Sequence, residues 1–266
     1  MNRLRVANLN LWHDSYQREK RVSSLVKYIN KYRIDVLLAQ EIFEYKGDSV
    51  LNYLSKETDL NYSRESKQDS STGILSLFPL REESFVSFPN PSLPYREFTF
   101  AGIERECHSI YFGSIHFAWG GRNELQRIHE AMALNAHVER VKKDIGYSAT
   151  IIGGDFNTPA NAQSIRYLKG LELIEGNSAY WSDATEKLKE PFITSTPNNR
   201  YALKTGSLIG FSYPENLPER GIDYQFAEGY AHAIVGGALE AKVCFKGGLF
   251  NPPPSDHYGL IVDYIC

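Results

Sequence analysis

The chain has 266 residues, of which 42% are hydrophobic, so it can bury a large core. Its net charge of −3 and pI of about 6.2 exclude a protein that bulk positive charge holds on nucleic acid. No run approaches the roughly 18 apolar residues of a membrane span, and the N-terminus shows no signal-peptide pattern. Three cysteines without a disulfide framework favour a reducing compartment. We therefore expect a soluble, cytoplasmic protein, with secretion of a processed chain as the alternative.

A strand, a helix and a second strand are predicted within the first forty residues. The alternation around Leu4 and Val6 predicts a strand that leads into a loop at residues 8–10. Apolar residues spaced i, i+3, i+4 and i+7 predict a helix over residues 18–32. The apolar run over residues 34–39 predicts a strand buried on both faces, and it stops at Gln40-Glu41. This order indicates an α/β fold.

The same patterns continue along the chain. They predict helices over residues 49–56, 123–143 and 161–169, and strands over residues 73–77, 109–117, 149–152, 222–226, 242–245 and 258–265. Residues 79–105, which four prolines punctuate, and residues 176–220 are expected to form long loops. No repeat or linker divides the chain, which predicts one domain over residues 1–266. This mixture favours two packed sheets with helices outside.

Glu41 closes the buried run at residues 34–39 and is a candidate ligand for a hard cation. Magnesium takes oxygen ligands, keeps several waters, and needs only one or two protein carboxylates in addition to a substrate phosphate. The alternative is a carboxylate that caps the next helix or pairs with a lysine, and the position of Glu41 fits it equally well.

Asp155 and Asn157 follow Gly153-Gly154 at the end of another predicted strand. Glycines let the backbone turn sharply and let another group approach closely. In an extended segment the two side chains would point to the same side. There the carboxylate could orient or deprotonate a water, and the amide could donate to a phosphate oxygen. The alternative is an Asx turn, in which Asp and Asn bond their own backbone.

Two histidines also lie beside predicted strands. His257 follows Asp256 and could act as a proton donor, a base or a phosphate-binding cation. Such a role needs a carboxylate on the other ring nitrogen, for which Asp223 is the candidate. His116 closes the segment Ser114-Ile115-His116. The other histidines are expected to be ordinary core residues: His13, His129, His137 and His232.

These polar residues form an ordered set, each beside a predicted strand: Asn10, Glu41, His116, Asp155, Asn157, Asp223, Asp256 and His257. The set resembles the endonuclease/exonuclease/phosphatase superfamily. Its motifs are a strand-end Asn, a Gln-Glu, a Ser-x-His, a Gly-Asp-x-Asn, an Asp-Tyr and a final Ser-Asp-His. The match runs from about Leu4 to Ile265, and its specificity lies in the order of the motifs.

The resemblance implies a four-layer sandwich of two mixed sheets flanked by helices. It also implies phosphoester hydrolysis that depends on magnesium or manganese. By matched position, it implies that Glu41 is the principal metal ligand and that Asn10 and Asp256 are supporting ligands. It implies that Asp155 aligns or deprotonates the attacking water, and that Asn157 and His116 contact the phosphate or the leaving group. It further implies that His257, oriented by Asp223, is a phosphate-binding or general-base histidine. Which of Asp155 and His257 takes the proton stays open.

The sequence also departs from one branch of the superfamily. Abasic-site endonucleases have an acid where Trp12 stands, and Asn10-Leu11-Trp12 is instead similar to neutral sphingomyelinases. The segment from Ser255 to Leu260 resembles the tyrosyl-DNA phosphodiesterases.

Three functions therefore compete. The first is a sphingomyelinase-like phosphodiesterase whose aromatic residues near Tyr201, Phe211 and Tyr213 touch a membrane peripherally. The second is a nuclease or DNA-end phosphodiesterase, with Arg122 and the basic residues Arg127, Arg140, Lys142 and Lys143 as phosphate contacts. The third is a non-catalytic phosphate-binding protein. We expect a monomer in each case.

Overall fold

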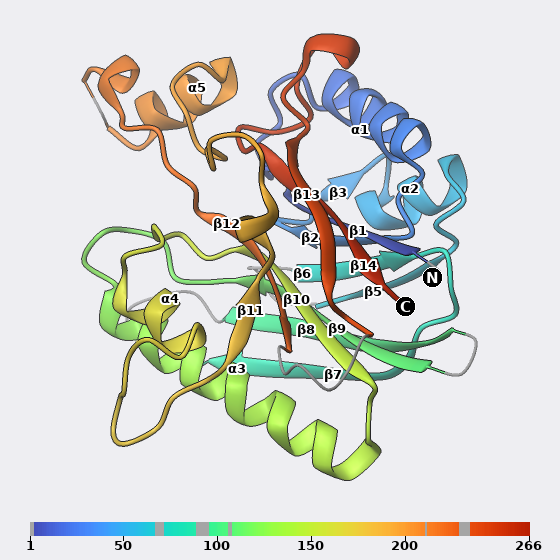
Figure 1. Cartoon of the computed structure of the whole chain (residues 1–266). Coiled ribbons are helices and arrows are strands. Elements are labelled where there is room, and N and C mark those ends of the chain that lie inside the picture. The colour runs from blue at the N-terminus through green and yellow to red at the C-terminus, as the bar shows by residue number, and fades with distance from the viewer. Residues whose placement is uncertain (1–2, 67–71, 89–95, 106–107, 211, 229–234) are drawn as a thin grey trace.

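Two six-stranded mixed sheets pack face to face in the computed structural model of the chain (Figure 1). The structure describes residues 3–266 except for 67–71, 89–95, 106–107, 211 and 229–234. The first sheet has the order β13-β14-β1-β2-β6-β5, and its strands are β1 (Arg3–Asn10), β2 (Val36–Gln40), β5 (Tyr62–Glu65), β6 (Thr72–Ser76), β13 (Ala238–Cys244) and β14 (Gly259–Ile265).

The second sheet has the order β11-β12-β10-β9-β8-β7. Its strands are β7 (Arg81–Phe88), β8 (Arg96–Arg105), β9 (His108–His116), β10 (Ala149–Asp155), β11 (Trp181–Asp183) and β12 (Asp223–Glu228). A small hairpin of β3 (Glu44–Tyr45) and β4 (Asp48–Ser49) lies outside both sheets. The helices are α1 (Arg18–Tyr32), α2 (Val50–Glu57), α3 (Glu124–Ile145), α4 (Gln163–Leu168) and α5 (Arg200–Leu208), with short 3-10 helices η1 (Ala184–Lys187), η2 (Pro214–Asn216) and η3 (Gly248–Phe250).

Three apolar clusters separate four layers and confirm the predicted sandwich. One lies between the first sheet and α1 and α2, one between the two sheets, and one between the second sheet and α3 and α4. β2 shows how a single strand serves two of them, because side chains alternate along a strand. Leu37 joins the cluster under α1, and Leu38 joins the cluster between the sheets. The prediction of a strand buried on both faces is therefore confirmed.

The connections bring strand ends of both sheets to one end of the sandwich. β1 and β2 run parallel and are joined by α1, and β9 and β10 run parallel and are joined by α3. Parallel strands joined by a helix end at the same edge of their sheet. β12 and β14 run antiparallel to β10 and β1, so they begin where those strands end.

The two expected loop regions differ in outcome: the expectation was wrong for residues 79–105, which are largely strands, whereas residues 176–220 are mostly irregular and contain short elements. Residues 79–105 hold β7 and β8, which pair with each other; Pro89, Pro91 and Pro94 lie outside the described residues. β7 is an edge strand with mostly exposed side chains, so it lacks a buried apolar run. Residues 176–220 hold β11, η1, α5 and η2. α5 buries only Tyr201 and Gly206, which gives too weak an apolar stripe to reveal a helix.

Within the described residues, no helix combines the length and the apolar composition that crossing a membrane requires.

Candidate active site

The predicted polar residues gather where strands of the two sheets end or begin. β1 ends at Asn10 and β10 ends at Asp155, which pairs in register with His116 of β9 on one side and with Asp223 of β12 on the other. Glu41 directly follows β2, and the Asp256–His257 pair precedes β14. Groups from six strands of both sheets therefore meet on a rigid frame.

Gly154 explains the glycines of the Gly-Gly-Asp motif. Its φ is 153°, and a Cβ atom there would lie 1.9 Å from the carbonyl oxygen of Ile115. Only glycine lets β10 come this close to β9. The close approach places Asp155 beside His116, whose Nε2 lies 3.6 Å from Oδ2 of Asp155.

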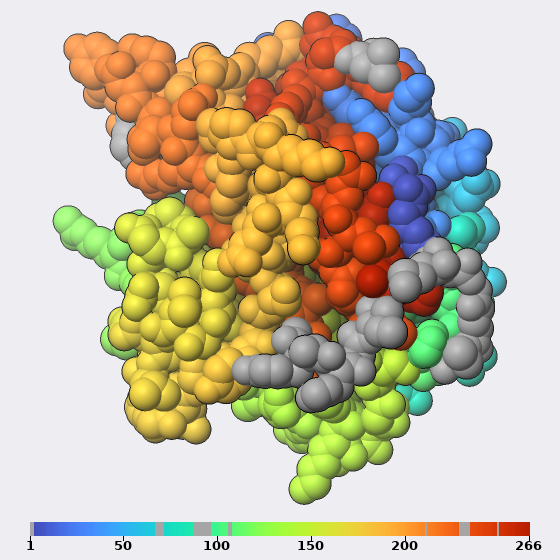
Figure 2. Space-filling model, viewed as in Figure 1, coloured from blue at the N-terminus to red at the C-terminus, as the bar shows by residue number. Residues whose placement is uncertain are grey.

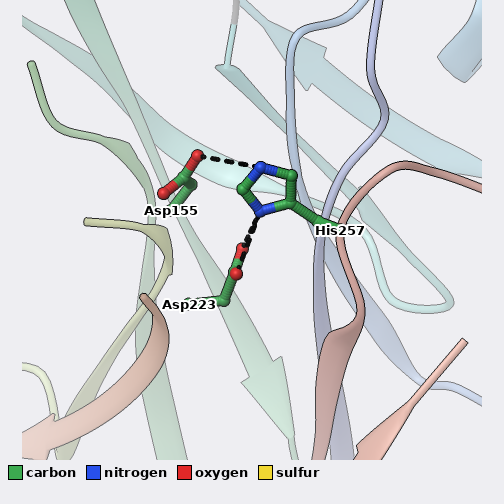
Figure 3. Close-up of side chains that lie close together, drawn as sticks. All are labelled: Asp155, Asp223 and His257. Atoms are coloured by element: carbon green, nitrogen blue, oxygen red, sulfur yellow. Dashed lines mark hydrogen bonds and ion pairs between the residues drawn. The ribbon is translucent and has the colours of Figure 1, made fainter. Parts of the chain in front are cut away.

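His257 bridges two buried carboxylates (Figure 3). Its Nδ1 lies 3.0 Å from Oδ2 of Asp223, and its Nε2 lies 3.8 Å from Oδ2 of Asp155. Burial alone would lower the pKa of His257, but the Asp223 and Asp155 carboxylates raise it well above its usual value. The imidazole therefore carries a proton near neutral pH. The predicted pairing of His257 with Asp223 is present.

Asp155 is the point at which the contacts converge. Its Oδ2 accepts a hydrogen bond of 3.1 Å from Nδ2 of Asn10, and its Oδ1 accepts one of 2.8 Å from the backbone N–H of Asn157. Burial and the nearby Asp223 charge raise the pKa of Asp155 to about 7, although the His257 charge opposes the shift. A carboxylate with such a pKa is suited to exchange a proton near neutral pH.

The segment after β10 forms the Asx turn rather than an extended strand. Asn157 has a left-handed φ of 52°, which Asn tolerates better than most residues, and its N–H bonds the Asp155 side chain. Its Nδ2 donates to the carbonyl oxygen of Phe117 at 3.0 Å. Of the two alternatives that the sequence left open, the Asx turn is therefore the one present. Asn157 instead ties the loop after β9 to the loop after β10.

Glu41 lies beside Asn10 and His13. Its Oε1 accepts a hydrogen bond of 2.9 Å from Nδ2 of Asn10, and its Oε2 lies 2.6 Å from Nδ1 of His13. Burial would raise the pKa of Glu41, but His13, His116 and Asn10 together hold it well below its usual range. The partner of the carboxylate is thus a histidine, and not a lysine or a helix terminus.

His13, which was expected to be a core residue, lies in the candidate site beside Glu41. Its side chain is 74% exposed, and its hydrogen bond to Glu41 raises its pKa. A usable signal was its position three residues after Asn10, in the loop that leaves the site. Of the other histidines expected in the core, His137 is buried and bonds Ser84 and Tyr111, whereas His129 is exposed. His232 lies outside the described residues.

Asp256 is held by α5, in the region expected to be a loop. Thr205 Oγ1 donates to its Oδ2 at 2.7 Å, and Ser255 Oγ donates to its Oδ1 at 3.2 Å. Burial and the charge of Glu41 raise the pKa of Asp256, while the His257 charge opposes the shift. Thr205 could not be found from sequence because 51 residues separate it from its partner.

A buried arginine braces the loops that carry these groups. Arg21 of α1 donates to the carbonyl oxygens of Leu11 at 3.0 Å, Trp12 at 2.9 Å and Tyr16 at 3.0 Å, and it also bonds that of Asp14. Its guanidinium lies 4.6 Å from the ring of Trp12. Burial lowers its pKa to about 10. A single side chain therefore fixes the loop between Asn10 and α1.

Two groups of side chains could hold a metal ion. Ligand atoms of Asp155, Asp223 and His257 lie within 4.8 Å of one another. Both nitrogens of that imidazole already face carboxylates, however, so a cation there would have to displace the imidazole proton. The second group is the predicted one, with the carboxylates of Glu41 and Asp256 and the amide of Asn10. It offers the oxygen donors that magnesium and manganese prefer. The Glu41 charge raises the pKa of Asp256, and a cation between the two carboxylates would relieve this repulsion.

Arg122 does not join this network. It is exposed in the turn before α3, and no hydrogen bond or ion pair links it to another residue in the described parts of the chain. Asn10, His116, Asn157 and Asp223 are connected through the contacts of Asp155, Glu41 and His257, and the hydrogen bonds of Asp256 go to Thr205 and Ser255.

Known proteins resemble the chain in both sequence pattern and fold. The model of the Endonuclease/Exonuclease/phosphatase family matches residues 7–257. Truncated TDP2 of Caenorhabditis elegans superposes with a TM-score of 0.75 at 13% identity, covering 99% of this chain and 98% of that one. TDP2 of D. rerio, complexed with single strand DNA product, gives a TM-score of 0.73 at 19% identity and covers 100% of both chains.

A bacterial structure shows the same fold. The endonuclease/exonuclease/phosphatase family protein from Leptotrichia buccalis has a TM-score of 0.71 at 17% identity, covering 99% of this chain and 100% of that one. No curated protein sequence matches the chain.

Proposed function

Because this chain belongs to the endonuclease/exonuclease/phosphatase family, whose members are phosphoester hydrolases, we propose that it is a metal-dependent phosphodiesterase. The observation that carries the proposal is the chain of contacts from Asp223 through His257 to Asp155. It joins a fixed imidazolium to a carboxylate with a pKa of about 7. Hydrolysis of an anionic phosphodiester requires a cation that attracts the phosphate and a base that activates the water, and these two groups could supply them.

Asp155 and His257 would share the work on water and phosphate. An ionised Asp155 accepts a proton from a water and holds that water in line with the phosphorus. The protonated His257 attracts a phosphate oxygen, and Asp223 keeps the imidazole in the required orientation. The high pKa of His257 supports phosphate binding over a role as the base, so we assign the proton transfer to Asp155.

Glu41, Asn10 and Asp256 would hold magnesium or manganese. When bound, such an ion neutralises charge on the phosphate oxygens and stabilises the leaving oxygen. Asn10 connects this group to the water-activating group, because its Nδ2 bonds both Glu41 and Asp155.

Hydrolysis of bis-p-nitrophenyl phosphate tests the proposal. We expect turnover with magnesium or manganese, none with EDTA, and a loss of at least about 100-fold in His257→Ala and Asp155→Asn. His129→Ala is the matched control, because His129 is exposed on α3. Wild-type turnover that is unchanged by EDTA, or retained in both variants, would refute the proposal.

A lipid head group is one candidate substrate. Leu208, Ile209 and Tyr213 are each more than half exposed on the segment that carries α5 and η2, which stands out at one corner of the molecule (Figure 2, orange). Against this, Tyr201 is buried and packs on Trp12 with ring centroids 5.2 Å apart, and Phe211 lies outside the described residues. Phosphocholine release from sphingomyelin vesicles no faster than in Asp155→Ala would remove this candidate.

A nucleic-acid end is the other candidate. It is favoured by the similarity in fold to the D. rerio TDP2 that is complexed with single strand DNA product. Such a substrate predicts cleavage of oligonucleotides carrying a terminal phosphodiester in the presence of magnesium or manganese. Intact plasmid and intact single-stranded oligonucleotide after long incubation would argue against it.

A further inference from the structure

We propose that the loop between β9 and α3 is a binding site for the nucleoside next to the scissile phosphate. Trp119 would stack on the base, and Arg122 would pair with the following phosphate. The inference rests on the proposed phosphodiesterase function and deepens it by naming the substrate class. It depends on three properties of the loop: its place beside the site, its rigid backbone and its unpartnered aromatic side chain.

The loop leaves directly from the site. The backbone N–H of Phe117 donates to the Asp155 carbonyl at 2.9 Å, and its carbonyl accepts from Nδ2 of Asn157 at 3.0 Å. Trp119 follows two residues after Phe117 and three residues after His116. Three residues of extended chain span at most about 10 Å, which is within reach of a nucleoside attached to a phosphate at the site.

The backbone of the loop is held residue by residue. The N–H of Ala118 donates to Oε2 of Glu130 at 2.8 Å, and its carbonyl accepts from Nη1 of Arg127 at 2.7 Å. Asn123 Nδ2 donates to the carbonyl of Trp119 at 2.6 Å, and Arg127 also reaches the carbonyl of Gly120 at 2.9 Å. Arg127 and Glu130 are both buried. Arg127 was expected to be a phosphate contact, but its guanidinium is held by this loop and by Glu124.

Trp119 differs from the other tryptophans of the chain. Trp12 is 4% exposed and lies between Arg21 and Tyr201, and Trp181 is 5% exposed and donates to Oδ1 of Asn135 at 3.0 Å. Trp119 is 54% exposed, and within the described residues neither a ring nor a cation contacts its indole. The backbone that carries this exposed ring is already fixed. Stacking a base on the ring therefore does not carry the entropic cost of ordering a loop.

The chemistry of the loop fits a nucleotide better than an aliphatic ester. An indole face stacks on any base, and such a contact contributes about 1–3 kcal/mol per base. An arginine three residues away offers a fork of donors to a phosphate. Arg122 is exposed and without a hydrogen-bond or ion-pair partner among the described residues, so its guanidinium is available for one.

Kinetics on two soluble diesters test the inference. One is thymidine 5′-p-nitrophenyl phosphate, and the other is methyl p-nitrophenyl phosphate, which shares the leaving group and lacks the nucleoside. We expect Trp119→Ala to lower kcat/KM on the thymidine diester about tenfold more than on the methyl diester. Trp119→Phe should restore most of this difference. Phe85→Ala, at another exposed aromatic residue, on β7, should change neither value.

Binding of fluorescent pentathymidylate in EDTA provides a second readout that does not depend on turnover. Trp119→Ala and Arg122→Gln should each raise its Kd by about fivefold or more. Equal losses on both diesters together with an unchanged Kd would overturn the inference, as would sphingomyelin turnover without any pentathymidylate binding. Absence of turnover by the wild type on every diester, with pentathymidylate still bound through Trp119, would instead refute the proposed catalytic function.

Discussion

Replacing Asp155 with asparagine should make the free energy of unfolding less dependent on pH. The folded pKa of Asp155 is about 7, whereas an aspartate in an unfolded chain has a pKa of about 3.9. Folding therefore favours the protonated form. The contribution of this group to stability is complete below the unfolded pKa and is lost as the pH rises through about 7.

The size of the effect follows from the two pKa values. Each pH unit between them corresponds to about 1.4 kcal/mol. Between pH 5 and pH 8 the wild type should therefore lose about 2–3 kcal/mol that Asp155→Asn does not lose. Asp223 holds the other nitrogen of His257 in both proteins and continues to raise the pKa of the imidazole in the variant. The variant should thus gain stability relative to the wild type as the pH rises to 8, while losing activity.

Urea unfolding in EDTA at pH 5, 6, 7 and 8 measures this difference. The unfolding free energy of the variant minus that of the wild type should rise steadily with pH. Asp144→Asn, an exposed acid on α3, is the matched control and should follow the wild type. If the unfolding free energies of Asp155→Asn and the wild type depend on pH in the same way, the reasoning is refuted. A variant-minus-wild-type difference that falls with pH would mean that the pKa of Asp155 is lowered instead.

Three further outcomes are expected. The kcat/KM on a soluble diester should rise through about pH 7 as Asp155 ionises, and a flat profile from pH 6 to 8 would contradict its role as the base. Arg21→Met should lower the unfolding free energy by about 3 kcal/mol, because four carbonyl oxygens lose a charged donor. Lys20→Met, at an exposed residue of the same helix, is the control, and an equal effect of the two substitutions would contradict the bracing role of Arg21. Thr205→Val removes a donor from Asp256 and should raise the metal concentration for half-maximal rate severalfold, with an unchanged value as the contrary result.

Local patterns predicted the frame of the molecule well. The amphipathic stripe over residues 18–32 has the bounds of α1, and the apolar run over residues 34–39 became β2. Both elements bury enough apolar surface to leave a clear signal in the sequence. β7 and α5 leave a weak one, because the first lies at a sheet edge and the second packs mainly through Tyr201.

The site was predictable only where its residues belong to strand ends. Asp155 and His257 follow from the order of strands and motifs. The supports for the site come from contacts between distant parts of the chain, such as Thr205 with Asp256 and Arg21 with the loop after β1. Those contacts depend on packing that no local pattern encodes. Trp12, on which the similarity to neutral sphingomyelinases partly rests, is a buried residue that packs between Arg21 and Tyr201.

The metal concentration for half-maximal hydrolysis of bis-p-nitrophenyl phosphate, measured in three proteins, tests the central claim most directly. If Glu41 holds the cation and Asp155 activates water, Glu41→Gln should raise this concentration about tenfold or more. Asp155→Asn should lower the maximal rate by at least about 100-fold and leave the metal concentration unchanged. A shift in Asp155→Asn as large as that in Glu41→Gln would contradict the account, because it would place the cation among Asp155, Asp223 and His257.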